Sequence, residues 1–165
     1  MINKFKKIVI KIGSSSIIDE ETGKVKIKWL NSLCKEIELL ANENKKIVIV
    51  SSGAIALGKK TISNHKVISR LEDKQAAAAI GQIELANCWQ QALKKNKINS
   101  AQLLLTLDDS EIRRRYLNVR KTISSLHKNK VIPIINENDT VATEEIRYGD
   151  NDRLAARVAQ MIDAD

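Results

Sequence analysis

The sequence is poor in the residues that build linkers and extended low-complexity regions. One proline and six glycines in 165 residues are too few for a flexible linker, and no internal repeat is present. The length is sufficient for one domain with its own hydrophobic core but short for two. We therefore expect residues 1–165 to form a single domain.

Long hydrophobic runs are absent as well. The longest ones, such as Ile47–Val50 and Leu103–Leu105, fall far short of the roughly 20 residues that a membrane-spanning helix needs. The first residues lead directly into the strand-like segment Ile8–Ile10, without the apolar region and small-residue cleavage site of a signal peptide. These features predict a cytoplasmic protein without a membrane partner.

Cysteines and aromatic residues are scarce. Cys34 and Cys88 lie in helix-like segments without a CxxC or Cys/His spacing, so we expect buried structural thiols and no metal site. Aromatic residues make up 3% of the chain, which leaves few side chains to stack on bases. The lysines behind the net charge of +8 are spread along the sequence, and Arg113–Arg115 follow acidic residues on a predicted helix. We interpret the charge as a solvated surface, with nucleic-acid binding as the less favoured alternative.

Four continuously apolar runs alternate with longer amphipathic stretches. The runs are the predicted strands: Lys7–Ile12, Lys46–Val50, Ala101–Leu105 and Val131–Ile135. Continuous hydrophobicity is typical of strands that are buried on both faces. The alternation predicts an α/β fold, a three-layer sandwich with a mainly parallel sheet and helices on both faces. Pro133 cannot donate a ladder hydrogen bond, so we expect it at a bulge or at the start of its strand.

The stretches between the runs have helical character. Residues 27–44 place apolar side chains, Ile27 among them, on one helical face, and residues 75–95 are rich in alanine. A third helix is predicted to begin at Asp108, with Glu111 in a capping arrangement, and to continue to Leu126. A last helix is predicted over residues 151–165. Because a doubly wound sheet would continue into another strand, we expect this chain to be part of a longer fold.

The first strand ends in a lysine and a run of small residues. Ligands of open parallel sheets bind at the carboxyl ends of the strands, which is where Lys11 and Gly13-Ser14-Ser15 are predicted to lie. A lysine within a buried strand needs an anionic partner, and the backbone N–H groups of a small-residue loop can cradle a phosphate. An edge-strand lysine that points to solvent is the equally open alternative.

The second strand is followed by Ser51-Ser52-Gly53-Ala54. The segment from Gly53 onward approaches a P-loop spelling but has Lys60 where the magnesium-binding hydroxyl should stand, and Ala54–Leu57 has the character of a helix start. A carboxylate bound at that helix N-terminus is a better functional interpretation. A helix cap without any ligand is the structural alternative.

Carboxylates and asparagines gather after the fourth strand, in Asn136–Thr140, and again in Gly149–Asp152. Asx turns and an N-cap would account for some of them. Two such clusters favour a site in which carboxylate and amide oxygens recognise an ammonium group or fix a catalytic lysine. The ligand spacing of a calcium-binding EF-hand is absent.

Five segments together resemble the glutamate 5-kinase branch of the amino acid kinase family, in the family's order. They are Lys11–Ser15, Ser51–Gly58, Lys74–Gln82, Asn136–Ala142 and Gly149–Asp152. Aspartate kinases and uridylate kinases fit this pattern less well. The resemblance implies transfer of the γ-phosphate of ATP to the side-chain carboxylate of L-glutamate, the first step of proline biosynthesis, with Mg²⁺ carried by the nucleotide.

The resemblance also implies a role for each matching residue. Lys11 would neutralise the transferring phosphoryl group and Asp152 would orient Lys11. Gly13, Ser14 and Ser15 would face the phosphates. Ser52, Asp139 and Asn151 match the family's glutamate-binding positions, and Asn136 and Glu137 would lie nearby in the same pocket. The N–H groups of Gly53 and Ala54, at the predicted helix start, would complete the substrate-binding set.

Family members continue beyond the matching segments with the loops that contact adenine and ribose and with a second catalytic lysine. We therefore expect weak or absent kinase activity from this chain alone. The alternative is a non-catalytic, amino-acid-binding or regulatory remnant of such a kinase. A homo-oligomer, and proline as a feedback inhibitor, are further expectations from the family.

Overall fold

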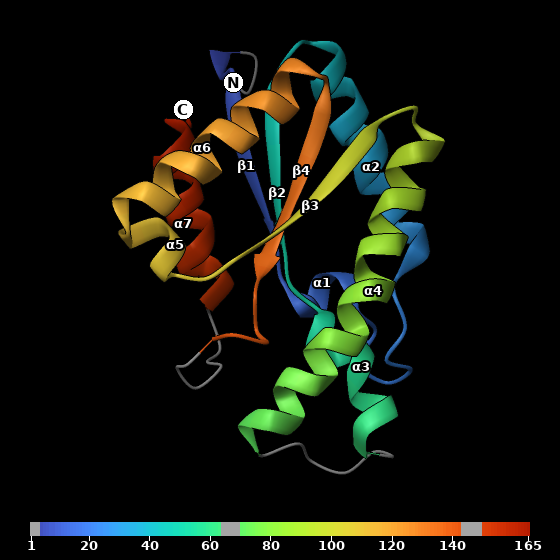
Figure 1. The fold of residues 1–165 in the computed structure, drawn as a ribbon. Helices are drawn as coiled ribbons and strands as arrows, with labels where there is room; N and C mark the ends of the chain where they lie inside the picture. Colours follow the sequence, from blue (N-terminus) through green and yellow to red (C-terminus); the bar gives the residue numbers. More distant parts are fainter. Residues whose placement is uncertain (1–3, 64–69, 143–149) are drawn as a thin grey trace.

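Four parallel strands form the centre of the molecule. The computed structural model describes residues 4–63, 70–142 and 150–165. Its sheet has the order β1-β2-β4-β3, and every pair of neighbours is parallel (Figure 1). The strands are β1 (Lys7–Ile12), β2 (Lys46–Ser51), β3 (Asn99–Leu105) and β4 (Val131–Glu137). All four predicted strands are confirmed, and three of them extend one or two residues further than the apolar runs.

Helices cover both faces of this sheet. On one face lie α2 (Ile27–Asn42) and α4 (Leu71–Lys95), and on the other α6 (Arg113–Lys128) and α7 (Asp150–Ile162), as Figure 1 shows. Three shorter helices connect them: α1 (Ser14–Ile17), α3 (Ala54–Ser63) and α5 (Asp108–Glu111). The predicted three-layer α/β architecture is therefore confirmed. Among the described residues, no helix is long and apolar enough to cross a membrane.

The core has two halves because β2 and β4 are buried on both faces. Ile47 and Ile49 of β2 pack against the layer of α2 and α4, whereas the alternate residues Val48 and Val50 pack against α6 and α7. Side chains on successive strand residues point to opposite faces, so a continuous apolar run fills both halves. The hydrophobicity pattern of the sequence thus has a direct structural cause.

Pro133 lies inside β4, and the expectation of a bulge or a strand start is wrong. It is the third residue of the strand and pairs with Ala101 of β3, and β4 is flanked by strands on both sides. The pairing of β4 with β2 begins only at Ile134, one residue beyond the proline. A strand can therefore hold proline here, because its missing N–H falls before that second ladder starts.

The predicted helix from Asp108 is in fact two helices. Ile112 has extended dihedral angles (φ −76°, ψ 109°) and separates α5 from α6. The expected capping pair of Asp108 and Glu111 is also wrong, because Asp109 accepts hydrogen bonds from the N–H and the hydroxyl of Thr106, at 2.8 and 3.0 Å. This turn redirects the chain after β3 before α6 packs on the sheet.

Three smaller expectations have mixed outcomes. Ile27 is 47% exposed at the first position of α2, so it lies outside the buried helical face. Cys34 is buried as expected, and burial raises its pKa to about 12, whereas Cys88 is only half-buried. Arg113–Arg115 form the exposed start of α6.

Helices α3 and α4 cross at two glycines. A Cβ atom on Gly58 would lie 1.9 Å from the carbonyl oxygen of Ala77, and one on Gly81 would lie 1.8 Å from that of Ala54. Only glycine allows the two backbones to approach this closely. The crossing fixes the start of α3 against α4 at the end of the sheet where the strands finish (Figure 1).

Candidate functional site

The carboxyl end of β1 presents a lysine that is paired with an aspartate. Lys11 Nζ lies 2.8 Å from Asp152 Oδ1, and the two side chains are 33% and 62% exposed. A Cβ on Gly13 would be 3.5 Å from the same ammonium nitrogen, so the lysine reaches over the start of the following loop. A pair this exposed contributes about 0–1 kcal/mol to stability. Fold stability alone is therefore a weak reason for this arrangement.

The loop after Lys11 is shorter than the sequence indicated. Ser14–Ile17 form the helix α1 directly after Gly13, and the N–H of Ser16 donates to Gly13 O at 3.2 Å. The expected small-residue loop is therefore wrong from Ser14 onward. Because the first N–H groups of a helix have no partner within it, the N–H groups of Ser14 and Ser15 still point out of the helix end.

A second cluster lies beside the first, around Asn151. Asn151 Nδ2 donates to Ser52 Oγ at 2.8 Å and to Asn136 Oδ1 at 3.0 Å. These residues come from three separate segments: Ser52 follows β2, Asn136 lies in β4, and Asn151 is the second residue of α7. Asn151 immediately precedes Asp152, so the head of α7 connects this cluster to the Lys11–Asp152 pair.

Asn151 Oδ1 is a buried acceptor without a donor among the described residues. Leaving a buried polar atom unpaired costs about 1–3 kcal/mol, so such atoms are rare in folded proteins. The neighbouring Ser52 hydroxyl accepts a hydrogen bond and still has a proton to donate. The cluster therefore offers an acceptor and a donor side by side, which suits a ligand that has both an N–H group and a carboxylate.

Backbone geometry holds Ser52 in this place. Its N–H donates to Ile12 O at 3.0 Å, which extends the contact between the ends of β1 and β2. Gly53 has φ +121°, and a Cβ there would lie 3.2 Å from Ile18 Cγ1, so this turn requires glycine. Ala54 then begins α3, whose N-terminal N–H groups face the carboxyl end of the sheet.

The segment from Gly53 to Lys60 is mostly helix, in agreement with the rejection of a P-loop. Lys60 donates instead to the carbonyl oxygen of Thr22, in the connection between α1 and α2. Among the residues that the structure describes, no group of three or more His, Cys, Asp and Glu side chains could hold a metal ion.

The remaining predicted residues lie at the end of β4 and in the turn after it. Glu137 ends the strand, and Asp139 follows in the turn, three residues beyond Asn136; both are half-buried. The N–H of Asn138 donates to Leu105 O at 2.8 Å, which ties this turn to the end of β3. Gly149 lies outside the described residues.

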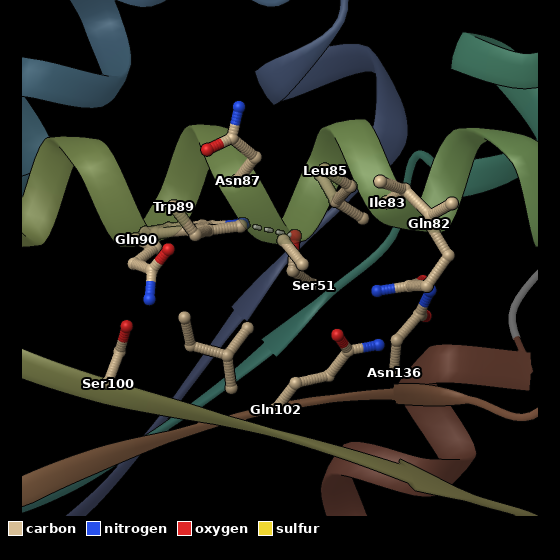
Figure 2. A pocket seen from close by; sticks show the side chains of 12 residues that line it. Ser51, Gln82, Ile83, Leu85, Asn87, Trp89, Gln90, Ser100, Gln102 and Asn136 are labelled. Atoms are coloured by element: carbon tan, nitrogen blue, oxygen red, sulfur yellow. Dashed lines mark hydrogen bonds between the residues drawn. The ribbon is translucent and has the colours of Figure 1, made fainter.

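Two residues of α4 that the sequence did not single out form hydrogen bonds that support the Asn151 cluster from the side of this helix. Asn136 Nδ2 donates to Gln82 Oε1 at 2.7 Å, and Trp89 Nε1 donates to the buried Ser51 Oγ at 2.9 Å. Both line a cavity of about 370 Å³ between α4 and strands β3 and β4 (Figure 2). Gln82 is the last residue of the segment Lys74–Gln82, and its place in this family-like segment is the feature of the sequence that could have pointed to it.

Comparisons with known proteins identify the family of this chain. A model described as the amino acid kinase family matches residues 6–165. The chain belongs to the amino acid kinase family. It is 56% identical over 164 residues to glutamate 5-kinase 1 of Mesorhizobium japonicum and 54% identical over 160 residues to glutamate 5-kinase of Paramagnetospirillum magneticum. The matches cover 99% and 97% of this chain but 43% of each relative, so the chain spans less than half of their length.

The amino acid kinase fold also appears in a solved structure with little sequence similarity. UMP kinase from Bacillus anthracis matches with a TM-score of 0.65 at 14% identity, over 98% of this chain and 62% of that protein. At this identity the match shows a shared fold only. It supports the order of strands and helices, and the choice of substrate must be argued from the site.

Proposed function

We propose that this chain is the part of a glutamate 5-kinase that binds the amino acid and receives the phosphoryl group. The reaction transfers the γ-phosphate of ATP to the side-chain carboxylate of L-glutamate. The observation that carries the proposal is the head of α7, where Asn151, whose Oδ1 has no donor among the described residues, directly precedes Asp152, the partner of Lys11. Relatives at 56% and 54% identity with the name glutamate 5-kinase support the same substrate.

In this proposal Lys11 and Asp152 act on the transferred group. Phosphoryl transfer needs positioning and stabilisation of spreading negative charge more than covalent chemistry. The Lys11 ammonium would lie against the transferring phosphoryl group, and Asp152 would keep it there at 2.8 Å from its own carboxylate. The N–H groups of Gly13, Ser14 and Ser15 would face the ATP phosphates, and Mg²⁺ would enter with the nucleotide.

The second cluster would hold glutamate so that its side-chain carboxylate reaches Lys11. Asn151 Oδ1 would accept from the α-ammonium group, and the Ser52 hydroxyl and the Gly53 and Ala54 N–H groups would donate to a carboxylate. Asn136 would orient Asn151, and the Asp139 carboxylate would add an anionic contact to the ammonium group. The side-chain carboxylate would then attack the γ-phosphorus of ATP in line, with ADP as the leaving group, so no covalent enzyme intermediate is needed.

Calorimetric titration with L-glutamate tests these roles. We expect saturable binding that is retained in Lys11→Ala, because that residue serves the phosphoryl group, and that is weakened at least about tenfold in Asp139→Ala. Lys28→Ala, which removes an exposed lysine from α2, is the charge-matched control for Lys11→Ala. Equal binding by the wild type and Asp139→Ala would contradict the assignment of the substrate site.

Further properties of the whole protein follow from the same proposal. A kinase that uses ATP for amino-acid biosynthesis would work in the cytoplasm, and residues 1–165 would form a single domain of it. Self-association is proposed because β3 is an edge strand of the described sheet and Leu104 on it is 38% exposed. We also propose proline as a feedback inhibitor, and we expect it to compete with glutamate in the same titration.

A further inference from the structure

Gln82 is the far end of a row of three hydrogen-bonded side-chain amides, Gln82, Asn136 and Asn151, that leads into the proposed substrate site. It is half-buried on α4 and accepts from Asn136 Nδ2 at 2.7 Å. Asn136, which is 3% exposed, then accepts from Asn151 Nδ2 at 3.0 Å. Figure 2 shows Gln82 and Asn136 facing each other at one end of the cavity behind the site.

The direction of this chain decides what the site presents to a ligand. A primary amide has an acceptor oxygen at one corner and a donor nitrogen at the other, so fixing one amide fixes the next. With Gln82 as the acceptor, Asn136 turns its oxygen to Asn151, and Asn151 keeps an oxygen that no donor in the described part of the chain reaches. If each of these amide hydrogen bonds ran in the opposite direction, Asn151 would present its NH₂ group to the ligand instead.

We propose that Gln82 is a positioning residue that sets this direction, so that the site presents an acceptor and selects ligands with an ammonium group. The inference rests on the proposed function, because it assigns the ligand donor to the amino group of the substrate. Gln82 acts through Asn136 and Asn151. Its role therefore differs from that of a residue that packs against the core or contacts the substrate.

Three substitutions separate hydrogen-bond direction from packing. Gln82→Glu keeps an acceptor and cannot donate when ionised, Gln82→Lys can only donate, and Gln82→Met has neither function at similar volume. We expect glutamate affinity within about threefold of the wild type in Gln82→Glu, and a loss of about tenfold or more in Gln82→Met and Gln82→Lys.

A simple effect of the added charge on glutamate affinity would have the opposite sign to the effect that we expect from hydrogen-bond direction. Glutamate carries a net negative charge, so a new anion would weaken its binding and a new cation would strengthen it. Gln90 supplies the matched controls, because it is an exposed glutamine of the same helix and lines the same cavity. Gln90→Glu and Gln90→Lys should change glutamate affinity by less than about threefold.

The test is a titration of the full 165-residue chain and these variants with L-glutamate and with glutarate, which lacks the amino group. The inference is supported if Gln82→Glu binds glutamate more tightly than Gln82→Met and Gln82→Lys do. The three variants should differ less in their affinity for glutarate. Equal affinities, or a weaker Gln82→Glu than Gln82→Lys, would overturn the inference.

The side-chain amide resonances of Asn136 and Asn151 in ¹⁵N NMR spectra provide a readout that does not depend on substrate. Gln82→Met and Gln82→Lys should shift the signals of both asparagines, while Gln82→Glu should leave Asn151 close to its wild-type position. An unchanged Asn151 signal in all three variants would overturn the inference. If the wild type binds no glutamate, the proposed function fails, and these spectra still decide the role of Gln82.

Discussion

Single side chains at the carboxyl edge are held mainly by directed hydrogen bonds. Asn151 donates twice, to Ser52 and to Asn136, and this fixes which of its corners remains for a ligand. The Lys11–Asp152 pair is exposed enough that its contribution to stability is small. At this scale, position and hydrogen-bond direction matter more than the strength of any one contact.

A histidine far from the candidate site makes the fold sensitive to acid. His127 donates from Nε2 to Ile47 O at 2.9 Å, and its pKa is lowered from the ordinary 6.5, chiefly because burial disfavours the charged ring. The unfolded chain therefore binds this proton more tightly than the folded protein. Stability from this residue is present above its ordinary pKa and is lost as the pH falls below it.

We accordingly expect the free energy of unfolding to be lower at about pH 5.5 than at about pH 7.5. His127→Gln keeps an N–H donor but does not titrate, so the pH dependence should be smaller in that variant. Urea unfolding at the two pH values measures both. An identical pH dependence in wild type and variant would contradict the role of His127.

Most of the candidate site residues could be predicted from the sequence, but the residues of α4 that form hydrogen bonds behind them could not. Lys11, Ser52 and Asn136 could be predicted because each stands at the carboxyl end of an apolar run, where parallel sheets bind ligands. Gln82 and Trp89 could not, since their roles depend on how α4 lies across the sheet. A helical pattern shows which residues share a face, but it does not show which strand residue they meet.

At the scale of elements, the α3–α4 crossing is the most sensitive point. The backbones approach so closely at Gly58 and Gly81 that an added methyl group would overlap a carbonyl oxygen. Gly81→Ala must push the helices apart, and we expect a loss of about 2–3 kcal/mol in the free energy of unfolding.

Ala79→Ser is the matched control, because it adds a group of comparable size to the exposed side of the same helix. Its effect should be below about 0.5 kcal/mol. Urea unfolding of both variants gives the comparison, and a Gly81→Ala protein as stable as the control would show that the helices can separate freely.

Elements were predicted well where hydrophobicity decides the structure and poorly where local backbone geometry does. The four strands follow from runs that fill both halves of the core. The break at Ile112 and the short helix after Gly13 depend on dihedral angles that these side chains allow but do not require. Pro133 was misjudged because its place in a strand depends on where the neighbouring ladder begins.

At the scale of the whole molecule, the layers bring separate segments to one edge. The loops after β1 and β2, the end of β4 and the head of α7 meet where the parallel strands finish (Figure 1). The chain spans 43% of the length of the two glutamate 5-kinases compared, and in the proposed function it provides the part that binds the amino acid and receives the phosphoryl group. We therefore expect glutamate to bind at this edge.

An NMR titration of the ¹⁵N-labelled chain with L-glutamate can locate the bound amino acid, residue by residue. We predict saturable shifts concentrated at Ser52, Gly53, Asn136 and Asn151, with smaller changes near Lys11. Shifts confined to the cavity between α4 and β3, or no saturable shifts at all, would contradict binding at this edge.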